Sequence, residues 1–194
     1  MAEEIGIGLI GTGFMGKCHA LAFGAVAATT DPTLRPRLEL LCDTDGDHAA
    51  AMARQFGFSR ATTDWRELVT DPAVDIVSIT APNALHHDMA VTAAQAGKHV
   101  YCEKPMALTV ANASAMADAV AEARVKSLVG YNYLRNPAIA YARQMIGDGE
   151  LGDVFSFRGI FDEDFMANAA TPFSWRCRGA DSGAGALGDM ATHL

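Results

Sequence analysis

Residues 5–19 read I-G-I-G-L-I-G-T-G-F-M-G-K-C-H, and this stretch decides the fold. An apolar strand pattern runs through a glycine-rich turn into a helical pattern, with Gly11, Gly13 and Gly16 in the G-x-G-x-x-G spacing of a dinucleotide-binding unit. There the first glycine permits a tight turn, the second leaves room for a pyrophosphate, and the third lets the helix pack close to the strand. The helix opening around Phe14 directs unpaired N–H groups at the phosphates. The glycine spacing alone also fits a turn that binds no ligand, so other features of the sequence must show whether a dinucleotide binds here.

Strand and helix patterns alternate from residue 4 to residue 130. Strands are predicted over 4–10, 38–42, 75–80, 98–102 and 127–130, and helices over 14–28, 48–56, 65–69, 85–96 and 109–124. Strict alternation implies right-handed crossovers and a parallel sheet covered on both faces. The sequence therefore predicts an α/β fold, a doubly wound parallel sheet, as a first domain over 1–130.

The composition favours a small-molecule partner. The chain has 194 residues, a net charge of -8 and no cluster of Lys and Arg, which argues against a nucleic-acid surface. No apolar run is long enough to span a bilayer, and no charged-then-apolar signal segment opens the chain, so we expect no membrane association and a cytoplasmic location. The four cysteines form no C-x-x-C pair, and neither a zinc ribbon nor a disulfide framework is indicated.

Asp43, at the end of the second predicted strand, is the candidate that selects the cofactor. An acidic residue at this place accepts hydrogen bonds from the adenosine ribose diol and repels a 2′-phosphate, which predicts NAD over NADP. The alternative is a turn or N-cap aspartate ahead of the helix over 48–56, and both roles are compatible.

Polar residues follow the buried strands at their carboxyl ends, where ligands bind in doubly wound sheets. Pro82 and Asn83, with His86, follow one strand, and Asn132 follows the last one. Lys104 stands between Glu103 and Pro105 after a third strand, and the proline restricts the backbone that carries it. A surface lysine paired with Glu103 is the alternative to a functional lysine.

Several of these motifs together resemble the Gfo/Idh/MocA oxidoreductases, the family of glucose-fructose oxidoreductase and inositol dehydrogenase. They are G-T-G-F-M-G at 11–16, A-P-N with His86, A-G-K-H-V-Y-C-E-K-P at 96–105 and G-Y-N at 130–132. The resemblance continues through S-W-R at 174–176 and G-A-G-A-L-G-D-M-A-T-H at 183–193, where Ala191 replaces a usual glycine.

The resemblance implies an NAD-dependent dehydrogenase that acts on a secondary alcohol of a sugar, inositol or other polyol. It places Lys104, Asp189 and His193 in the catalytic site, with His193 as general acid and base, Lys104 on the reacting oxygen, and Asp189 orienting the substrate or the imidazole. The implied cofactor-binding residues are Gly11, Gly13, Phe14, Met15, Gly16, Asp43, Pro82, Asn83, His86, Glu103, Lys104, Asn132, Trp175 and Arg176.

The residues themselves support part of this assignment. Asp189 and His193 are four positions apart, so on one helix their side chains share a face. One alternative is a solvent-facing pair of Asp189 and His193, and another is a half-built zinc site. The other histidines offer no complementary pair, so we expect no metal.

The chain after residue 130 is expected to begin a second domain, over 131–194. The alternating pattern V-F-S-F-R-G-I-F within 153–162 predicts a strand, and the resemblance implies an α+β domain with an open antiparallel sheet whose C-terminal part is missing here. It also implies a homo-oligomer, a dimer or tetramer, for the full-length form. Two other functions stay open: an NAD-binding regulatory module without turnover, and a lyase or glycosidase that oxidises its substrate transiently.

Overall fold

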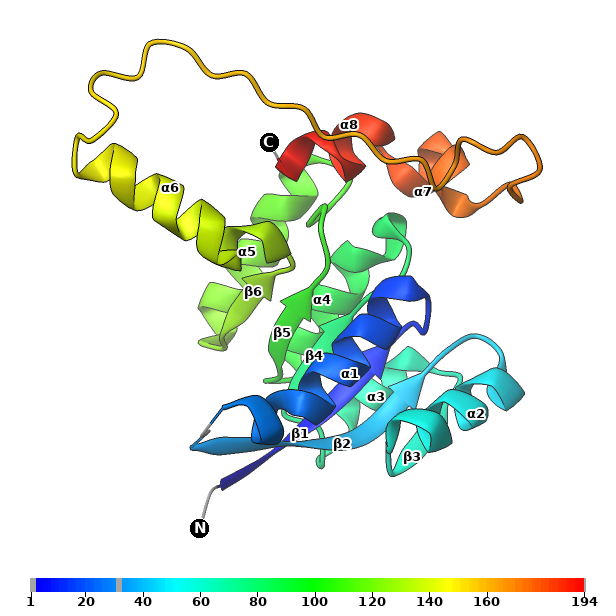
Figure 1. The fold of residues 1–194 in the computed structure, drawn as a ribbon. Helices are drawn as coiled ribbons and strands as arrows, with labels where there is room; N and C mark the ends of the chain where they lie inside the picture. The colour runs from blue at the N-terminus through cyan, green and yellow to red at the C-terminus, as the bar shows by residue number, and fades with distance from the viewer. Residues whose placement is uncertain (1–2, 31–32, 194) are drawn as a thin grey trace.

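The structure is a computed structural model and describes residues 3–30 and 33–193. In these residues a single parallel sheet has the strand order β3-β2-β1-β4-β5-β6, and Figure 1 shows its strands running side by side through the molecule. The strands are β1 (Glu3–Ile10), β2 (Leu34–Cys42), β3 (Arg60–Thr62), β4 (Ile76–Ile79), β5 (His99–Cys102) and β6 (Ser127–Val129). The order reverses between β1 and β4, which is the position where doubly wound sheets bind dinucleotides. The predicted α/β fold is confirmed for this part of the chain.

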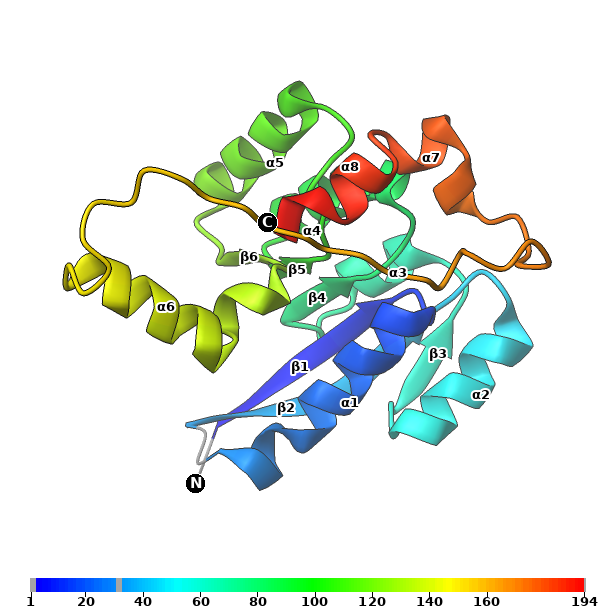
Figure 2. The ribbon, with the colours of Figure 1, turned by 45° about the horizontal axis from the view of Figure 1, so that its top comes forward.

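Helices connect the strands and cover the sheet on both faces. They are α1 (Phe14–Thr29), α2 (Gly46–Phe56), α3 (Trp65–Thr70), α4 (His86–Gln95), which follows the short 3₁₀ turn η1 (Asn83–Leu85), and α5 (Val110–Ala123). Figure 2 shows α1 and α2 on one side of the sheet and α3, α4 and α5 on the other.

The two apolar layers follow from the period of two along each strand. Leu9 and Leu41 pack with α1 and α2 in one cluster of buried residues, whereas Ile10 and Leu40 pack with α3, α4 and α5 in the other. Successive strand residues point to opposite faces, so nearly continuous apolar strands give each layer its own core.

Two elements of the first domain differ from the prediction. β2 begins at Leu34 and includes Pro36, because this part of the strand pairs with β1 only and β3 joins it from Leu40 onward. A proline is tolerated where a strand has a free edge. β3 was not predicted, since three residues carry too little periodicity to be recognised.

The segment after β6 contains short helices and a long connection. After η2 (Asn132–Arg135) come α6 (Pro137–Gly147), η3 (Trp175–Cys177), α7 (Gly179–Ser182), α8 (Ala186–Asp189) and η4 (Ala191–His193). The helix α6 was not predicted, although Asn136 at its N-cap and Pro137 in its first turn are helix-start signals.

The predicted strand over 153–162 is not present. These residues form no ladder with any other described segment, and Figure 1 shows them in the long trace that runs from α6 towards α7. Phe155 and Phe157 are 98% and 77% exposed. The alternation is that of a strand, but a strand needs a hydrogen-bonded neighbour, and the described residues provide none.

Candidate active site

The glycine turn between β1 and α1 has the shape that its spacing predicts. Gly11 has a φ of +91°, and a Cβ on Gly16 would lie 2.1 Å from the carbonyl oxygen of Gly11. A Cβ on Gly13 would meet nothing within 4 Å, so the turn is open on the side where a pyrophosphate approaches. Gly13 is the N-cap of α1, no side chain caps the helix, and its first turn holds no acidic residue. These free N–H donors fit an anionic dinucleotide.

The first turn of α1 also places the next predicted contacts. Phe14 is 78% exposed, and Met15 is half-buried behind it. Both therefore lie at the mouth of the turn, and their contact with a cofactor stays a prediction.

Asp43 lies beside the same turn. Its Oδ2 accepts hydrogen bonds from the hydroxyl and, over 2.9 Å, from the backbone N–H of Thr12, and its Oδ1 accepts from the N–H of Thr44 over 2.7 Å. Burial opposes ionisation, but the bonds from Thr12 and Thr44 outweigh it and lower the pKa of the Asp43 carboxyl below its usual value. The N-cap of α2 is Asp45, not Asp43. Asp43 is thus a fixed, half-buried anion that holds the turn, and its contact with a ribose stays a prediction.

Lys104 follows β5 and meets a residue far along the chain. Its Nζ donates to the Oδ1 and the backbone oxygen of Asp189, over 2.7 and 2.6 Å, while its side chain is 15% exposed. Arg176 donates from Nε to Oδ2 of the same carboxylate over 3.4 Å. Burial opposes ionisation of Asp189, but these two cations outweigh it and lower the pKa of its carboxyl. Lys104 therefore does not form the surface pair with Glu103 that was the alternative interpretation.

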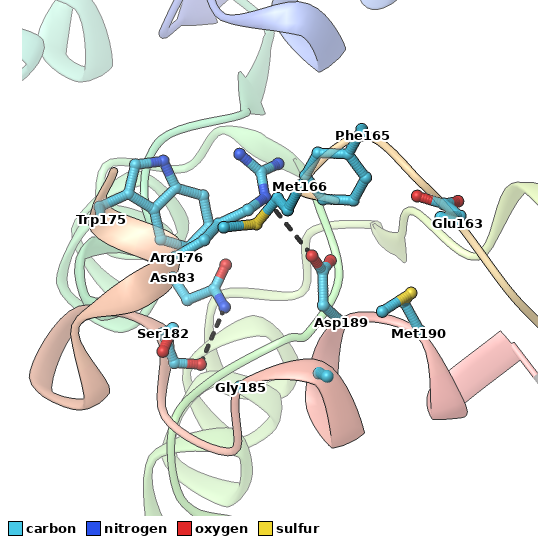
Figure 3. A pocket seen from close by; sticks show the side chains of 11 residues that line it. Asn83, Glu163, Phe165, Met166, Trp175, Arg176, Ser182, Gly185, Asp189 and Met190 are labelled. Carbon is cyan, nitrogen blue, oxygen red and sulfur yellow. Dashed lines mark hydrogen bonds and ion pairs between the residues drawn. The ribbon is translucent and has the colours of Figure 1, made fainter. Parts of the chain in front are cut away.

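A small cavity of about 100 Å³ lies next to this cluster. Figure 3 shows Trp175, Arg176 and Asp189 around it, with the Arg176 guanidinium above the Trp175 ring at 4.6 Å from the ring centre. The lining residues are Asn83, Glu163, Phe165, Met166, Trp175, Arg176, Ser182, Gly185, Ala186, Asp189 and Met190. The amide nitrogen of Asn83 donates to the carbonyl oxygen of Ser182 over 3.1 Å, which joins the loop after β4 to α7.

His193 does not share a helix face with Asp189, so this part of the prediction is wrong. α8 ends at Asp189, and His193 lies in the separate turn η4. Its ring packs against Tyr133 at 4.7 Å and Phe161 at 5.2 Å, and its Nδ1 is buried with no hydrogen-bond partner among the described residues. Burial and the charge of Lys104 lower the pKa of the His193 imidazole below its ordinary value of 6.5. The ring is therefore neutral at neutral pH and able to accept a proton.

Two predicted cofactor contacts are buried and already engaged. His86 is fully buried, and its ring nitrogens face the carbonyl oxygens of Pro105 and Ala81. The carboxylate of Glu103 accepts from His19 and from the N–H of Lys104. Both side chains thus make contacts within the protein, and a direct contact of either one with a dinucleotide stays a prediction.

The remaining predicted residues stay near the carboxyl edge of the sheet. Pro82 is half-buried ahead of η1, and Asn132 is exposed at the start of η2, where its N–H donates to the oxygen of Gly130 over 3.0 Å. The sequence prediction did not include Thr12 or the packing of Tyr133 and Phe161 against His193. Thr12 stands inside the quoted turn, whereas no spacing rule links Phe161 to a residue more than thirty positions later.

Other features limit the chemistry of the described residues. Within 3–30 and 33–193, no three His, Cys, Asp or Glu side chains gather as a metal site requires, and no helix is long and apolar enough to cross a membrane. The four cysteines are free, and burial raises the pKa of the Cys42 and Cys102 thiols to about 12. These two thiols are unreactive core residues.

Comparison with known proteins gives two family matches. A model described as an oxidoreductase family with an NAD-binding Rossmann fold matches residues 5–131, and a model of the GFO/IDH/MocA C-terminal domain matches residues 139–194. The chain belongs to the Gfo/Idh/MocA family.

Named members of the family are similar along nearly the whole chain. Levoglucosan dehydrogenase from Pseudarthrobacter phenanthrenivorans is 42% identical over 99% of this chain and 50% of its own length. The 1,5-anhydro-D-fructose reductase of Ensifer adhaerens is 34% identical over 96% of this chain and 53% of its own. A solved levoglucosan dehydrogenase in complex with NADH and levoglucosan superposes with a TM-score of 0.94 at 42% identity, over 99% of this chain and 52% of that one. The chain thus spans about half the length of these family members.

Proposed function

We propose that the protein is an NAD-dependent dehydrogenase that oxidises a secondary alcohol of a sugar, anhydrosugar, inositol or other polyol. The observation that carries this proposal is the pair of Lys104 and Asp189, which comes from segments 85 positions apart and lies beside a cavity at the carboxyl edge of the sheet. The names of the similar family members support the substrate class, since they act on levoglucosan, 1,5-anhydro-D-fructose and scyllo-inositol.

The glycine turn and Asp43 would hold the cofactor. Gly13 leaves the pyrophosphate side of the turn open, and the free N–H groups of α1 bind its negative charge. Asp43 accepts from the ribose diol and repels a 2′-phosphate, so NAD is preferred over NADP. When bound, NAD takes the hydride from the alcohol carbon, and the protein supplies position and electrostatics.

Three side chains would act on the alcohol. The neutral imidazole of His193 accepts the hydroxyl proton as the hydride leaves. The ammonium of Lys104 donates a hydrogen bond to the same oxygen and stabilises the negative charge that develops there. Asp189 contacts Lys104 and Arg176 in the structure, so we assign it to holding the lysine charged and in place. In the reverse direction His193 returns the proton.

The remaining parts of the proposal concern the whole protein. Residues 1–130 form the cofactor domain, and residues 131–194 begin a substrate and oligomerisation domain. The homo-oligomeric state and the cytoplasmic location stay predictions from the sequence.

The test is NADH formation with a panel that contains levoglucosan, 1,5-anhydro-D-glucitol and scyllo-inositol. We expect one class to reduce NAD with release of a ketone, and Lys104→Met to lower turnover about 10²-fold or more while NAD still binds. Absence of NADH with every alcohol, in a protein that binds NAD, would contradict dehydrogenase activity. A product that has lost water or a glycosidic bond would show that the substrate is oxidised only transiently, as in a lyase or glycosidase.

A further inference from the structure

Lys104 stands between two residues that are each held by a buried histidine. Its neighbour on one side, Glu103, contacts His19 of α1, and its neighbour on the other side, Pro105, contacts His86 of α4. The exposed fractions of His19 and His86 are 5% and 0%. Neither imidazole reaches the cavity, so neither acts on a substrate directly.

His19 joins the phosphate-binding helix to β5. Its Nε2 donates to Oε1 of Glu103 over 2.9 Å, and in the neutral ring Nδ1 accepts from the hydroxyl of Ser78, 2.8 Å away. Oε2 of Glu103 accepts the backbone N–H of Lys104 over 3.2 Å. The carboxylate therefore transmits the position of α1 directly to the backbone of Lys104.

The side chain of Glu103 and its partner His19 are closely packed. A Cβ on Gly130 would lie 2.6 Å from Oε1 of Glu103, and the His19 ring stacks on Tyr101 with 4.5 Å between ring centres. The order Ser78, His19, Glu103 has the composition of a hydrolytic triad, but Ser78 is 0% exposed. A nucleophile must reach its substrate, so the group is a support and not a second active site.

His86 holds the other neighbour of Lys104. Its Nδ1 lies 2.9 Å from the carbonyl oxygen of Pro105 and its Nε2 lies 2.8 Å from that of Ala81. Burial lowers the pKa of the His86 imidazole, and a neutral ring carries one N–H, which we assign to Nδ1 as the donor to Pro105. His86 begins α4 directly after η1, which carries Asn83, so this one bond joins that segment to the loop after β5, which carries Lys104.

We propose that His19 and His86 are positioning residues for Lys104, and that they make the glycine turn, the Asn83 loop and the lysine one rigid unit. Displacing a catalytic group by about 1 Å can lower the rate about 10²-fold. The contacts of His19 and His86 with the two neighbours of Lys104 would therefore raise turnover by keeping the lysine in place. The kinetic consequence rests on the dehydrogenase function proposed above, whereas the placement of the lysine does not.

Four variants in the intact protein test this proposal, because Asn and Gln each replace one ring nitrogen. The amide of Gln stands near Nε2 of histidine, and that of Asn stands near Nδ1. His19→Gln therefore keeps the donor to Glu103, and His19→Asn loses it. His86→Asn keeps the donor to Pro105, and His86→Gln loses it. His99→Gln is the matched control. His99 lies on β5, the strand that precedes Lys104, but its Nδ1 accepts the N–H of Lys126 and contacts neither neighbour of Lys104.

The expected kinetic pattern is opposite at the two positions. His19→Asn and His86→Gln lose about 10²-fold in kcat while the KM for NAD stays within about threefold, and His19→Gln, His86→Asn and the control stay near wild type. Equal losses for Asn and Gln at both positions, or losses confined to KM, would overturn the proposal. If one damaging variant does not fold, the pair at the other histidine decides.

A second readout does not depend on turnover. Acetic anhydride labels exposed lysines, and peptide mass spectrometry reports Lys104 relative to Lys98, whose Nζ donates to the carbonyl oxygens of Asp71 and Val74. We expect His19→Asn and His86→Gln to lose the protection of Lys104 while Lys98 is unchanged. Unchanged protection of Lys104 in both variants would overturn the proposal. A wild type without any dehydrogenase activity but with this labelling pattern would reject the proposed function and retain the anchors.

Discussion

Residues 3–130 and residues 131–193 differ in how they are held. In the described part of the chain, every fully buried apolar side chain belongs to the first region, and all except Ile7 lie in two clusters on the two faces of the sheet. In the second region, Phe155, Phe157 and Ile160 are 77–98% exposed. The first region is thus stabilised by its own core, whereas the second has none in these residues.

The second region contacts the first next to the candidate active site. Its attachments are the bond from Asn83 to Ser182, the ion pair of Lys104 with Asp189, and the close approach of Gly183 to Leu108. The glycine turn and Asp43, which we propose to hold the cofactor, therefore lie on the self-supporting region, whereas His193, the proposed proton acceptor, lies on the region without its own core. Substitutions in one region at a time test this difference between the two regions.

The largest expected effect is on the stability of the first region. Leu68 is 0% exposed between α3 and the sheet, so Leu68→Ala should lower the free energy of unfolding by about 2–5 kcal/mol. Phe157→Ala removes a side chain that is 77% exposed, and should change it by less than about 0.5 kcal/mol. Urea denaturation of both variants measures the difference, and similar losses would show that the second region also has a packed core.

Removing the negative charge of Asp189, which pairs with Lys104 between the two regions, should lower activity. Asp189→Asn keeps the shape but leaves the ammonium of Lys104 without its anionic partner, and we expect kcat/KM to fall about tenfold or more. Asp181→Asn is the matched control, since Asp181 pairs with Arg178 on the surface of the same region. Steady-state kinetics of both variants decide this, and equal values would place Asp189 outside the reaction.

Asp43 should affect the cofactor and not the alcohol. Asp43→Asn removes the charge that repels a 2′-phosphate and weakens the acceptor for the ribose, so NAD affinity should fall about tenfold and the preference over NADP should narrow. Asp45→Asn keeps an N-cap on α2 and is the control. Calorimetric titration with both dinucleotides gives the two affinities, and an unchanged ratio would remove Asp43 from cofactor selection.

The smallest effect is a shift in pH dependence. Alcohol oxidation needs neutral His193, and burial lowers the pKa of this imidazole, so activity should persist on acidification until the pH falls below 6.5. Phe161→Ser admits water beside the ring, which should move the acid limb of kcat/KM up towards 6.5. A limb that stays in place after this change would mean that another group titrates.

The sequence predicted the first region well and the second region poorly. The glycine spacing, the alternation and Asp43 are local patterns, and they place the sheet and the cofactor turn correctly. The resemblance placed Lys104 and Asp189 in one site, but their ion pair was not predicted, because no local pattern reports which side chains meet in space. The alternation over 153–162 predicted a strand, but pairing depends on a neighbour that the pattern itself does not contain.

The same limit applied to the histidines. The resemblance implied that His86 binds the cofactor, and nothing in the sequence indicated that its ring is fully buried with its nitrogens next to two backbone carbonyl oxygens. Whether a histidine can contact a cofactor depends on how deeply its ring is buried, and the sequence position alone does not predict that burial.

The most direct test of the division is to measure NAD affinity and turnover together in His193→Ala. We expect turnover to fall about 10²–10⁴-fold while the Kd for NAD changes by less than about threefold, because the imidazole would act on the alcohol, whereas the glycine turn and Asp43 would hold the cofactor. Losses of affinity and turnover in the same proportion would contradict it.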